Sequence, residues 1–387
     1  MKKVLLWETS SAVAGGQKMT LLVMDLLKEN YEFHCLIPQE GPLTAELKKR
    51  NIPYTLMGDQ SMPSGVKGKQ VYFQYAWLSV KNILNSLRAI CRFRPDLLYA
   101  PGPASLPWSA ICGAVTGKPV VWHLHHLFQD GPTKKLLNFT CRWKSVRKII
   151  AISKVVGDQI DHPVGTQKVE CICNPVETER FTAGDPACLP ENLKVWLSGK
   201  TGSLILLESG VLRSIKRQDL FACVVDALKK RQIPVAGILL GDAITEEDAD
   251  FKKQLLCLID EMGLQDDIYL AGHQKNVQDY LAAADFLFVP GIEGLSLAAL
   301  EAMAARCDIV ATQAGGVGEL LQAADCGCLY PHEANPDQIA DLIVEAYRMD
   351  RTQKLQNGID FCADHTPSAY RKSMEQCFAD CVKNSGR

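Results

Sequence analysis

The feature that most constrains the fold is a rhythm that runs through the 387-residue chain twice. Short apolar runs alternate with longer stretches in which apolar residues recur at helical spacing. Strands that alternate with helices pair in parallel, with right-handed crossovers. The rhythm breaks at residues 182–200, where glycine, proline and polar residues gather. The sequence therefore predicts two Rossmann-like, doubly wound α/β domains, over residues 1–185 and 186–360.

Individual elements follow from the same rhythm. In the first domain we expect strands near residues 3–7, 32–37, 53–57, 96–100, 119–124, 148–153 and 168–173, helices near 17–29, 42–50, 76–93 and 104–116, and a loop over 58–75. In the second domain we expect strands near 203–209, 235–240, 267–270, 285–289, 308–312 and 327–330, and helices near 217–231, 250–262, 276–283, 295–305, 316–323 and 335–348. The tail, residues 361–387, reads as an amphipathic helix that packs on either domain.

Composition narrows the function classes. A net charge of −2 argues against a nucleic-acid binder. The sequence contains no run of 18 apolar residues, so we expect no membrane-spanning helix. Residues 1–185 hold 23 Lys and Arg against 15 Asp and Glu, whereas the remainder holds 19 against 29. Fifteen cysteines, an odd number, fit small buried hydrophobes in a reducing cytoplasm better than disulfides. The first apolar run ends at Glu8 and is too short for a signal peptide, so we interpret it as the first buried strand.

The strongest chemical signal lies between residues 285 and 319. An apolar strand ends at Pro290, a short loop follows, and an Ala- and Leu-rich helix is expected from near Gly294. Amides that open a helix bind anions, so this loop predicts a phosphate site. Glu293 and Glu301 are carboxylates that can accept hydrogen bonds from sugar hydroxyls, about 12 Å apart if both are helical. The alternative is that Glu293 caps the helix and Glu301 lies on a solvated face.

The stretch from Glu293 to Glu301 resembles the paired-glutamate motif of the retaining family-4 glycosyltransferases, which have the GT-B fold. The runs VQDYLAAADFLFVP, LEAMA and IVATQAGGVGELL, and the pair Gly272-His273, extend the resemblance, which covers most of the chain. It implies two domains facing across a cleft, a C-terminal helix that crosses back to the first, and transfer of a sugar from a nucleoside-diphosphate sugar with retention. It also implies that neither metal nor cofactor is needed.

The resemblance carries specific roles in the second domain. Lys216 falls on the family's lysine, but Val211 stands directly after Gly210, where the family has arginine, so Arg213 or Arg217 would supply the second cation. In this reading Lys216, Arg213 and the amides of Gly294, Leu295 and Ser296 stabilise the diphosphate leaving group. Glu301 binds the ribose, Glu293 orients the sugar, and the loop at His273 holds the base. A solvated basic loop is the alternative for residues 213–217.

In the first domain, Gly15 and Gly16 match the family's glycine-rich loop, and glycines there admit donor phosphates or the reacting sugar. His125, at the end of the run Val-Val-Trp-His-Leu-His-His, aligns with the family's active-site histidine. His123 shares a strand face with His125, whereas His126 points away. A buried structural histidine and a metal-dependent hydrolase both remain alternatives, although the second lacks further ligands.

A basic and aromatic stretch forms a candidate anionic-membrane surface. Its first part, residues 134–148, contains no acidic residue and contributes Lys134, Lys135, Phe139, Arg142, Trp143, Lys144, Arg147 and Lys148. Its second part, residues 72–94, contributes Tyr72, Phe73, Tyr75, Trp77, Arg88, Arg92 and Arg94. A solvated basic helix is the alternative. We expect a cytoplasmic protein whose acceptor is a glycan or a lipid-linked molecule. If the membrane reading holds, the protein is also peripheral on the inner face of the membrane.

We therefore expect a glycosyltransferase of polysaccharide or glycolipid synthesis. Two alternatives stay open: a nucleotide-sugar-binding or assembly protein that has lost catalysis, which Val211 favours, and a nucleotide-sugar epimerase of the same fold. A dehydrogenase is disfavoured because the first loop lacks Gly-x-Gly-x-x-Gly. The base, the sugar, the acceptor and the oligomeric state do not follow from the sequence.

Overall fold

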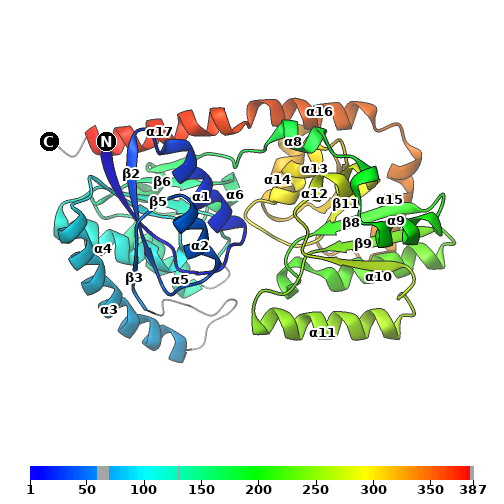
Figure 1. Ribbon diagram of the computed structural model, residues 1–387, viewed down its shortest axis with the longest axis horizontal. Helices are drawn as coiled ribbons and strands as arrows, with labels where there is room; N and C mark the ends of the chain where they lie inside the picture. Colours follow the sequence, from blue (N-terminus) through cyan, green and yellow to red (C-terminus); the bar gives the residue numbers. More distant parts are fainter. Residues whose placement is uncertain (59–68, 129–130, 384–387) are drawn as a thin grey trace. The chain divides into compact units, whose positions relative to one another are not determined.

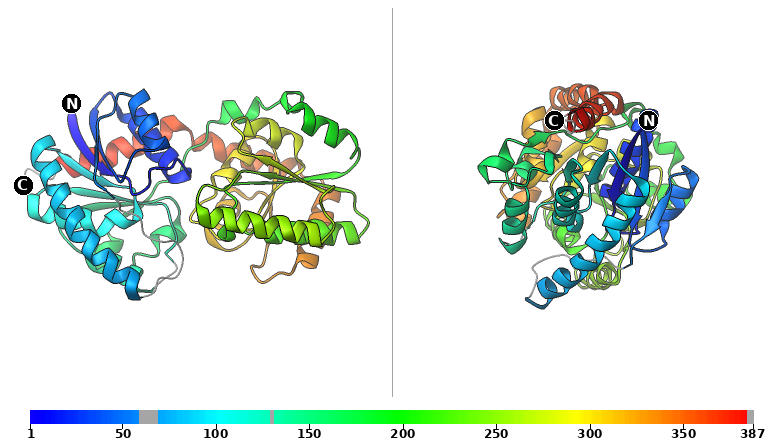
Figure 2. Two further views of the ribbon diagram at one scale, coloured as in Figure 1. Left: turned by 60° about the horizontal axis from the view of Figure 1, so that its bottom comes forward. Right: turned by 90° about the vertical axis from the view of Figure 1, so that its left-hand side faces the viewer.

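A computed structural model describes residues 1–58, 69–128 and 131–383. The chain forms two compact units (Figure 1), the first comprising residues 1–174 and 367–383 and the second Pro175–Thr366. Each unit holds one parallel sheet with helices on both faces (Figure 2). The α/β class and the repeated doubly wound arrangement are as predicted.

The first unit is built on a seven-stranded sheet of order β3-β2-β1-β4-β5-β6-β7. Its strands are β1 (Lys2–Trp7), β2 (Tyr31–Ile37), β3 (Tyr54–Leu56), β4 (Leu97–Ala100), β5 (Val120–Leu124), β6 (Val146–Ala151) and β7 (Val169–Cys171). Its helices are α1 (Gly15–Leu27), α2 (Pro42–Lys49), α3 (Lys69–Phe93), α4 (Leu106–Thr116), α5 (Gly131–Thr140), α6 (Lys154–Gly157), α7 (Pro163–Thr166) and α17 (Pro367–Lys383). The order of strands reverses between β1 and β4, which is where ligands bind in open α/β sheets.

The second unit has a six-stranded sheet of order β10-β9-β8-β11-β12-β13. Its strands are β8 (Leu204–Ser209), β9 (Val235–Leu240), β10 (Ile268–Gly272), β11 (Phe286–Val289), β12 (Asp308–Thr312) and β13 (Cys328–Tyr330). Its helices are α8 (Thr178–Thr182), α9 (Glu191–Ser198), α10 (Gln218–Lys230), α11 (Glu246–Glu261), α12 (Val277–Ala283), α13 (Leu297–Ala304), α14 (Gly315–Ala324), α15 (Pro336–Arg348) and α16 (Thr352–Asp364). The corresponding reversal lies between β8 and β11.

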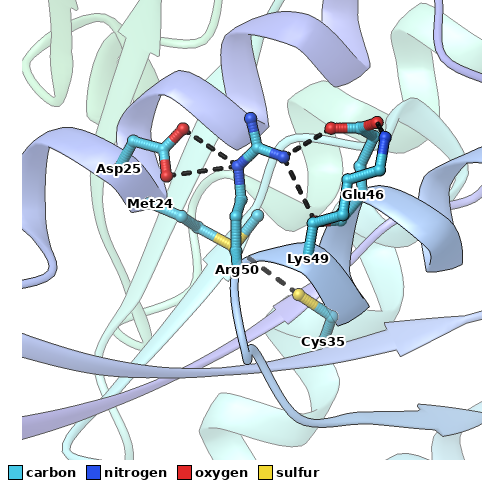
Figure 3. Close-up of polar contacts among 6 residues, drawn as sticks. All are labelled: Met24, Asp25, Cys35, Glu46, Lys49 and Arg50. Atoms are coloured by element: carbon cyan, nitrogen blue, oxygen red, sulfur yellow. Dashed lines mark hydrogen bonds and ion pairs between the residues drawn. The ribbon is translucent and has the colours of Figure 1, made fainter.

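Ion pairs fasten the helices of the first unit to each other. Arg50, at the end of α2, donates from Nε to both carboxylate oxygens of Asp25 on α1, at 2.9 and 3.2 Å (Figure 3). Its Nη1 donates to Glu46 Oε2 at 2.6 Å. Beneath this pair the Cys35 thiol contacts the Met24 sulfur at 3.6 Å, in the buried layer between α1 and β2. This cysteine packs as a small hydrophobe, as the cysteine content of the sequence predicts.

The C-terminal helix α17 belongs to the first unit. Tyr370, Met374, Cys377 and Phe378 are all buried, and α17 packs against α1 and β4–β6. The ring of Phe378 lies 5.2 Å from that of Tyr99 on β4 and 5.5 Å from that of Tyr31 on β2. The predicted return of the C-terminal helix to the first domain is thus present (Figure 1).

Several element boundaries differ from the predictions. The loop expected over 58–75 lies partly outside the described residues, but its last part is wrong, because α3 begins at Lys69. Helix α11 begins four residues early, because Thr245 accepts a hydrogen bond from the Asp248 amide and caps it. Helices α6 to α9 and α16 were not expected, and the tail helix expected from residue 361 begins at Pro367, because α16 continues to Asp364.

The segment 175–185 packs in the second unit, whereas the sequence places it in the first domain. A Cβ on Gly184 would lie 2.3 Å from the carbonyl oxygen of Gln278, so only glycine permits this approach to α12. The Asp185 amide donates to Asp279 at 3.0 Å, and Phe181 is buried. These contacts tie the segment to α12, which a change in composition cannot reveal.

Candidate functional site

Four loops meet at the carboxyl edge of the second sheet, and glycines bring them together. A Cβ on Gly241, after β9, would lie 1.8 Å from the carbonyl oxygen of Gly210, after β8. A Cβ on Gly316 would lie 1.8 Å from the carbonyl oxygen of Gly294, and one on Gly291 would lie 2.6 Å from that of Ile215. Such approaches are closed to any residue with a side chain. The loops after β8, β9, β11 and β12 therefore form one close-packed cluster.

An ion pair lies at the switch point of this sheet. Lys216 follows β8 and Glu293 follows β11, and Nζ of the lysine lies 2.6 Å from Oε1 of the glutamate. Both side chains are partly buried, with 24% and 19% of their surface exposed. The Gly316 amide donates to the carbonyl oxygen of Glu293 at 2.7 Å, which holds the glutamate's backbone in place. The sequence-predicted residues Lys216, Gly210 and Glu293 are thus brought together.

Arg213 is engaged elsewhere in the same unit. Its Nε and Nη2 donate to the two carboxylate oxygens of Asp248, at 2.6 and 2.8 Å. The Asp248 side chain is 2% exposed. Although its burial opposes the charged form, the guanidinium and the hydrogen bonds from Thr245 lower the pKa of Asp248 to about 2. A diphosphate would have to compete with this bidentate pair for Arg213.

The phosphate loop differs in detail from the prediction. Helix α13 begins at Leu297 rather than near Gly294, because Ser296 is its N-cap and accepts from the Ala299 amide at 3.3 Å. Gly294 and Leu295 are buried loop residues. The first three amides of α13 have no backbone acceptor within the helix. Because the Ala299 amide donates to Ser296, the amides of Leu297 and Ala298 are the two that a phosphate could use. Glu301 lies in the second turn of the helix and is half-buried, and Glu293 precedes the helix, so the 12 Å helical spacing does not apply.

His273 lies at the end of the edge strand β10. It is exposed and follows Gly272, whose φ of 68° is in the left-handed region. Its charge acts on Asp242, whose pKa is lowered chiefly by the hydrogen bond from Lys252 at 2.6 Å. The loops after β9 and β10 therefore lie near each other, since the Gly241 amide also donates to the Gly272 carbonyl at 2.8 Å.

The first unit places its candidates at the carboxyl edge of its own sheet. Gly15 and Gly16 begin α1, after the loop of residues 8–14 that follows β1, and a Cβ on Gly16 would meet nothing within 4 Å. His125 follows β5 and is 8% exposed, and its ring centroid lies 4.0 Å from that of His123. His126 is exposed, in agreement with its predicted outward direction. Burial lowers the pKa of His125 well below its usual range.

Two buried carboxyl groups, one in each unit, were not predicted from the sequence as site residues. Glu8 ends the first strand region and accepts hydrogen bonds from Thr20 Oγ1 at 2.5 Å and Gln17 Nε2 at 3.0 Å. Glu208 lies in β8 and its Oε2 is buried without a hydrogen-bond partner among the described residues. Burial raises the pKa of both. Their signal in the sequence is an acidic residue at the end of an apolar strand.

The described residues hold no cluster of three His, Cys, Asp or Glu side chains arranged for a metal ion. Within the same residues, no helix has both the length and the apolarity that crossing a bilayer requires.

Comparison with known proteins shows which protein families this chain resembles. The model of the family "Glycosyl transferases group 1" matches residues 194–358, and that of "Glycosyltransferase Family 4" matches residues 17–180. Among curated proteins, the chain is 33% identical over 113 residues to the lipopolysaccharide core biosynthesis mannosyltransferase LpsB of Rhizobium meliloti, which is 29% of this chain and 32% of the relative. It is 22% identical over 290 residues to the sulfoquinovosyl transferase SQD2 of Arabidopsis thaliana, which is 71% of this chain and 53% of the relative. The chain thus spans about a third to a half of the length of these relatives.

Solved structures share the fold over the whole chain. HepE of Anabaena in complex with UDP superposes with a TM-score of 0.79 at 19% identity, covering 98% of this chain and all of that one. A glycosyltransferase from Rickettsia africae gives a TM-score of 0.74 at 18% identity, covering 99% of each chain. The two family models together match both units, and the fold agrees, so this chain belongs to the family-4, group 1 glycosyltransferases with the GT-B fold.

Proposed function

We propose that this protein transfers a sugar from a nucleoside-diphosphate sugar to a hydroxyl acceptor, with retention of the anomeric configuration. The observation that carries the proposal is the Lys216–Glu293 pair at the switch point of the second sheet, surrounded by the four glycine-dependent loops. This position is where α/β sheets bind ligands, and a lysine beside backbone amides suits a diphosphate. HepE, a protein of the same fold, has been solved in complex with UDP, which supports a nucleoside-diphosphate donor for this chain as well.

In this proposal Lys216 and the opening amides of α13 neutralise the charge that develops on the leaving diphosphate. The C1–O bond to the phosphate breaks, and its electron pair stays with the diphosphate. The acceptor oxygen bonds to C1 on the same face, and its proton passes to a diphosphate oxygen. In the second unit Glu301 accepts from the ribose hydroxyls, Glu293 orients the sugar, and the loop at His273 holds the base. In the first unit His125 offers a hydrogen bond to a substrate hydroxyl. Lys216 leaves Glu293 for the diphosphate when the donor binds.

Donor binding is tested by a thermal-shift panel of UDP, GDP and ADP, followed by their sugars. A true ligand at 100 times its Kd stabilises the protein by about 2.7 kcal/mol. The matched control for Lys216→Ala is Lys194→Ala, because Lys194 also pairs with a glutamate, Glu191 at 2.8 Å, but on the surface helix α9. We expect the shift to vanish in Lys216→Ala only. No shift with any nucleotide in the unmodified protein would overturn the proposal.

Val211 favours a second candidate, a nucleotide-sugar-binding protein without transferase activity. The side chain stands where the family has arginine, and Arg213 is held by Asp248, so one expected cation is missing from the diphosphate site. Slow donor hydrolysis by the purified protein, abolished in Lys216→Ala, would favour the enzyme. Nucleotide binding without hydrolysis, and hydrolysis gained in Val211→Arg, would favour the second candidate.

For the acceptor side we propose peripheral binding to anionic lipid at the cytoplasmic leaflet. Helices α3, α4 and α5 pack side by side over one face of the first sheet and contain no Asp or Glu. On α3, Trp77, Val80 and Leu84 form a stripe at helical spacing and are 75%, 56% and 51% exposed. Such a basic helix with an exposed apolar stripe suits the membrane interface. The side chains of Tyr72 and Phe73, also predicted for this surface, lie outside the described residues.

Basic side chains extend this surface around an open cavity of about 500 Å³, which Lys118, Trp143, Lys144 and Arg147 line. Lys148 does not join it, because it pairs with Glu170 at 2.7 Å. We therefore propose a glycolipid or lipid-linked acceptor. Each basic residue near an anionic surface is worth about 1 kcal/mol.

Co-sedimentation with vesicles that contain phosphatidylglycerol tests this surface. The triple variant Lys118→Gln, Lys144→Gln, Arg147→Gln should lose binding. The control, Lys2→Gln, Lys48→Gln, Lys49→Gln, removes equal charge from β1 and α2 and should bind normally. Equal pelleting of both variants would refute the membrane proposal and leave the donor proposal intact.

A further inference from the structure

The first unit contains a chain of three aromatic side chains that leads to His125. The hydroxyl of Tyr99, on β4, lies 2.5 Å from Nδ1 of His123, on β5. The ring of His123 lies 4.0 Å from that of His125, with 40° between their planes. Tyr99 and His123 are 0% exposed, so neither reaches solvent or a ligand directly.

Hydrogen-bond accounting assigns the proton positions in this chain. Burial raises the pKa of Tyr99 far above its usual range, so the hydroxyl keeps its proton. Among the described residues, the only acceptor recorded for that proton is Nδ1 of His123. Donation by Tyr99 therefore leaves His123 with its own proton on Nε2, which has no acceptor within the same residues. This accounting fixes both the tautomer and the rotation of the His123 ring.

The environment keeps both imidazoles uncharged. Burial lowers the pKa of His123 to about 3, and burial together with the neighbouring His123 and His126 lowers the pKa of His125. The other titratable groups that act on this chain lie around Tyr99: Tyr370 and Cys377 on α17, and Glu8 after β1. A neutral imidazole offers one donor and one acceptor, which suits a sugar hydroxyl, whereas an imidazolium would attract phosphate.

We propose that Tyr99 and His123 are positioning residues, which hold His125 in one orientation as a neutral hydrogen-bonding group for a substrate hydroxyl. The role of His125 toward substrate rests on the proposed function. The orientation and tautomer of the pair do not, because they are properties of the protein without substrate. Unlike Tyr99 and His123, His125 is partly exposed, at 8%, and its Nε2 has no hydrogen-bond partner among the described residues. Nε2 is therefore the atom whose hydrogen-bonding capacity a substrate hydroxyl would fill.

The test uses the full-length protein labelled with ¹⁵N-histidine, in which long-range ¹H–¹⁵N spectra distinguish the two imidazole tautomers. Tyr99→Phe removes the hydroxyl and keeps the ring that packs on Phe378. Tyr370→Phe is the matched control: its hydroxyl is also buried, acts on Tyr99 and has no hydrogen-bond partner in the described residues.

We expect His123 to carry its proton on Nε2 from pH 5.5 to 8 in the unmodified protein and in Tyr370→Phe. In Tyr99→Phe we expect mixed tautomers, and kcat/KM lower by roughly fivefold, the value of one lost hydrogen bond. The loss of kcat/KM in Tyr99→Phe should be largest at low pH, because a His125 ring that is no longer held in place protonates more readily. His123 protonated on Nδ1 in the unmodified protein, or a Tyr99→Phe variant with unchanged spectra, would overturn the inference. Expected spectra without detectable sugar transfer would instead count against the proposed function alone.

Discussion

The pairing of Arg213 with Asp248 predicts that this arginine stabilises the second unit more than it serves the donor. Asp248 is 2% exposed and accepts two hydrogen bonds from the guanidinium, and its pKa is about 2. Relative to an ordinary aspartate, this lowering amounts to about 2 kcal/mol at neutral pH. Because the folded pKa is depressed, the stabilisation is complete above about pH 4 and is lost as the pH falls toward 2. Because hydrogen bonds from Thr245 contribute to this lowering and burial opposes it, we take the coupling energy between the two residues from the usual value of a hydrogen bond to a charged group, roughly 1.5–3 kcal/mol at pH 7.

A double-mutant cycle with Arg213→Ala and Asp248→Asn measures this coupling. Trp196 is the one tryptophan in the second unit, and the other five lie in the first. Urea unfolding followed by the ¹⁹F signal of 5-fluorotryptophan at position 196 therefore reports the second unit by itself. The exposed pair Lys194–Glu191 serves as control and should couple by less than about 0.5 kcal/mol. An Arg213–Asp248 coupling as small as the control, or nucleotide affinity lost in Arg213→Ala without any loss of stability, would refute this reasoning.

Three further predictions concern the loops and the buried carboxyl groups. Gly316→Ala should strongly destabilise the second unit in calorimetric melting, because its Cβ would lie 1.8 Å from the Gly294 carbonyl, and a melting temperature equal to the parent's would contradict this packing. Gly16→Ala should leave the melting temperature unchanged, since its Cβ meets nothing within 4 Å, and reduced activity in this variant would show that substrate uses the space. Glu8→Gln should stabilise the first unit at pH 7, because burial raises the pKa of Glu8 and makes its charged form unfavourable there. In urea unfolding, the gain in unfolding free energy should shrink as the pH falls below the raised pKa. A gain that does not change with pH would contradict this prediction.

Much of the fold follows from the sequence because periodicity reports which faces are buried. The strands of the second sheet lie within one or two residues of their predicted places, from β8 to β13. The start of α3 was missed because the preceding segment is rich in glycine and serine, and the four residues that α11 gains depend on the Thr245 cap. Such caps are local contacts that shift an element by a turn without changing its periodicity.

The candidate site was predicted only at the level of which residues come together. Lys216 and Glu293 are far apart in sequence, and the switch point between β8 and β11 joins them, as the doubly wound rhythm implies. The ion pair between Arg213 and Asp248 could not be predicted, because arginine and aspartate are both residue types that usually lie on the protein surface. The Tyr99–His123 contact depends on the pairing of β4 with β5 and on side-chain directions that periodicity does not give.

The central claim is that the loops around Lys216 bind the diphosphate of a nucleotide, and calorimetric titration of UDP, GDP and ADP into the unmodified protein and Lys216→Ala tests it most directly. We predict saturable binding of at least one nucleoside diphosphate, with an affinity loss of roughly tenfold or more in the variant, the value of one charge-assisted hydrogen bond. Equal affinity of the two proteins for every nucleotide, or no binding by either, would contradict the account.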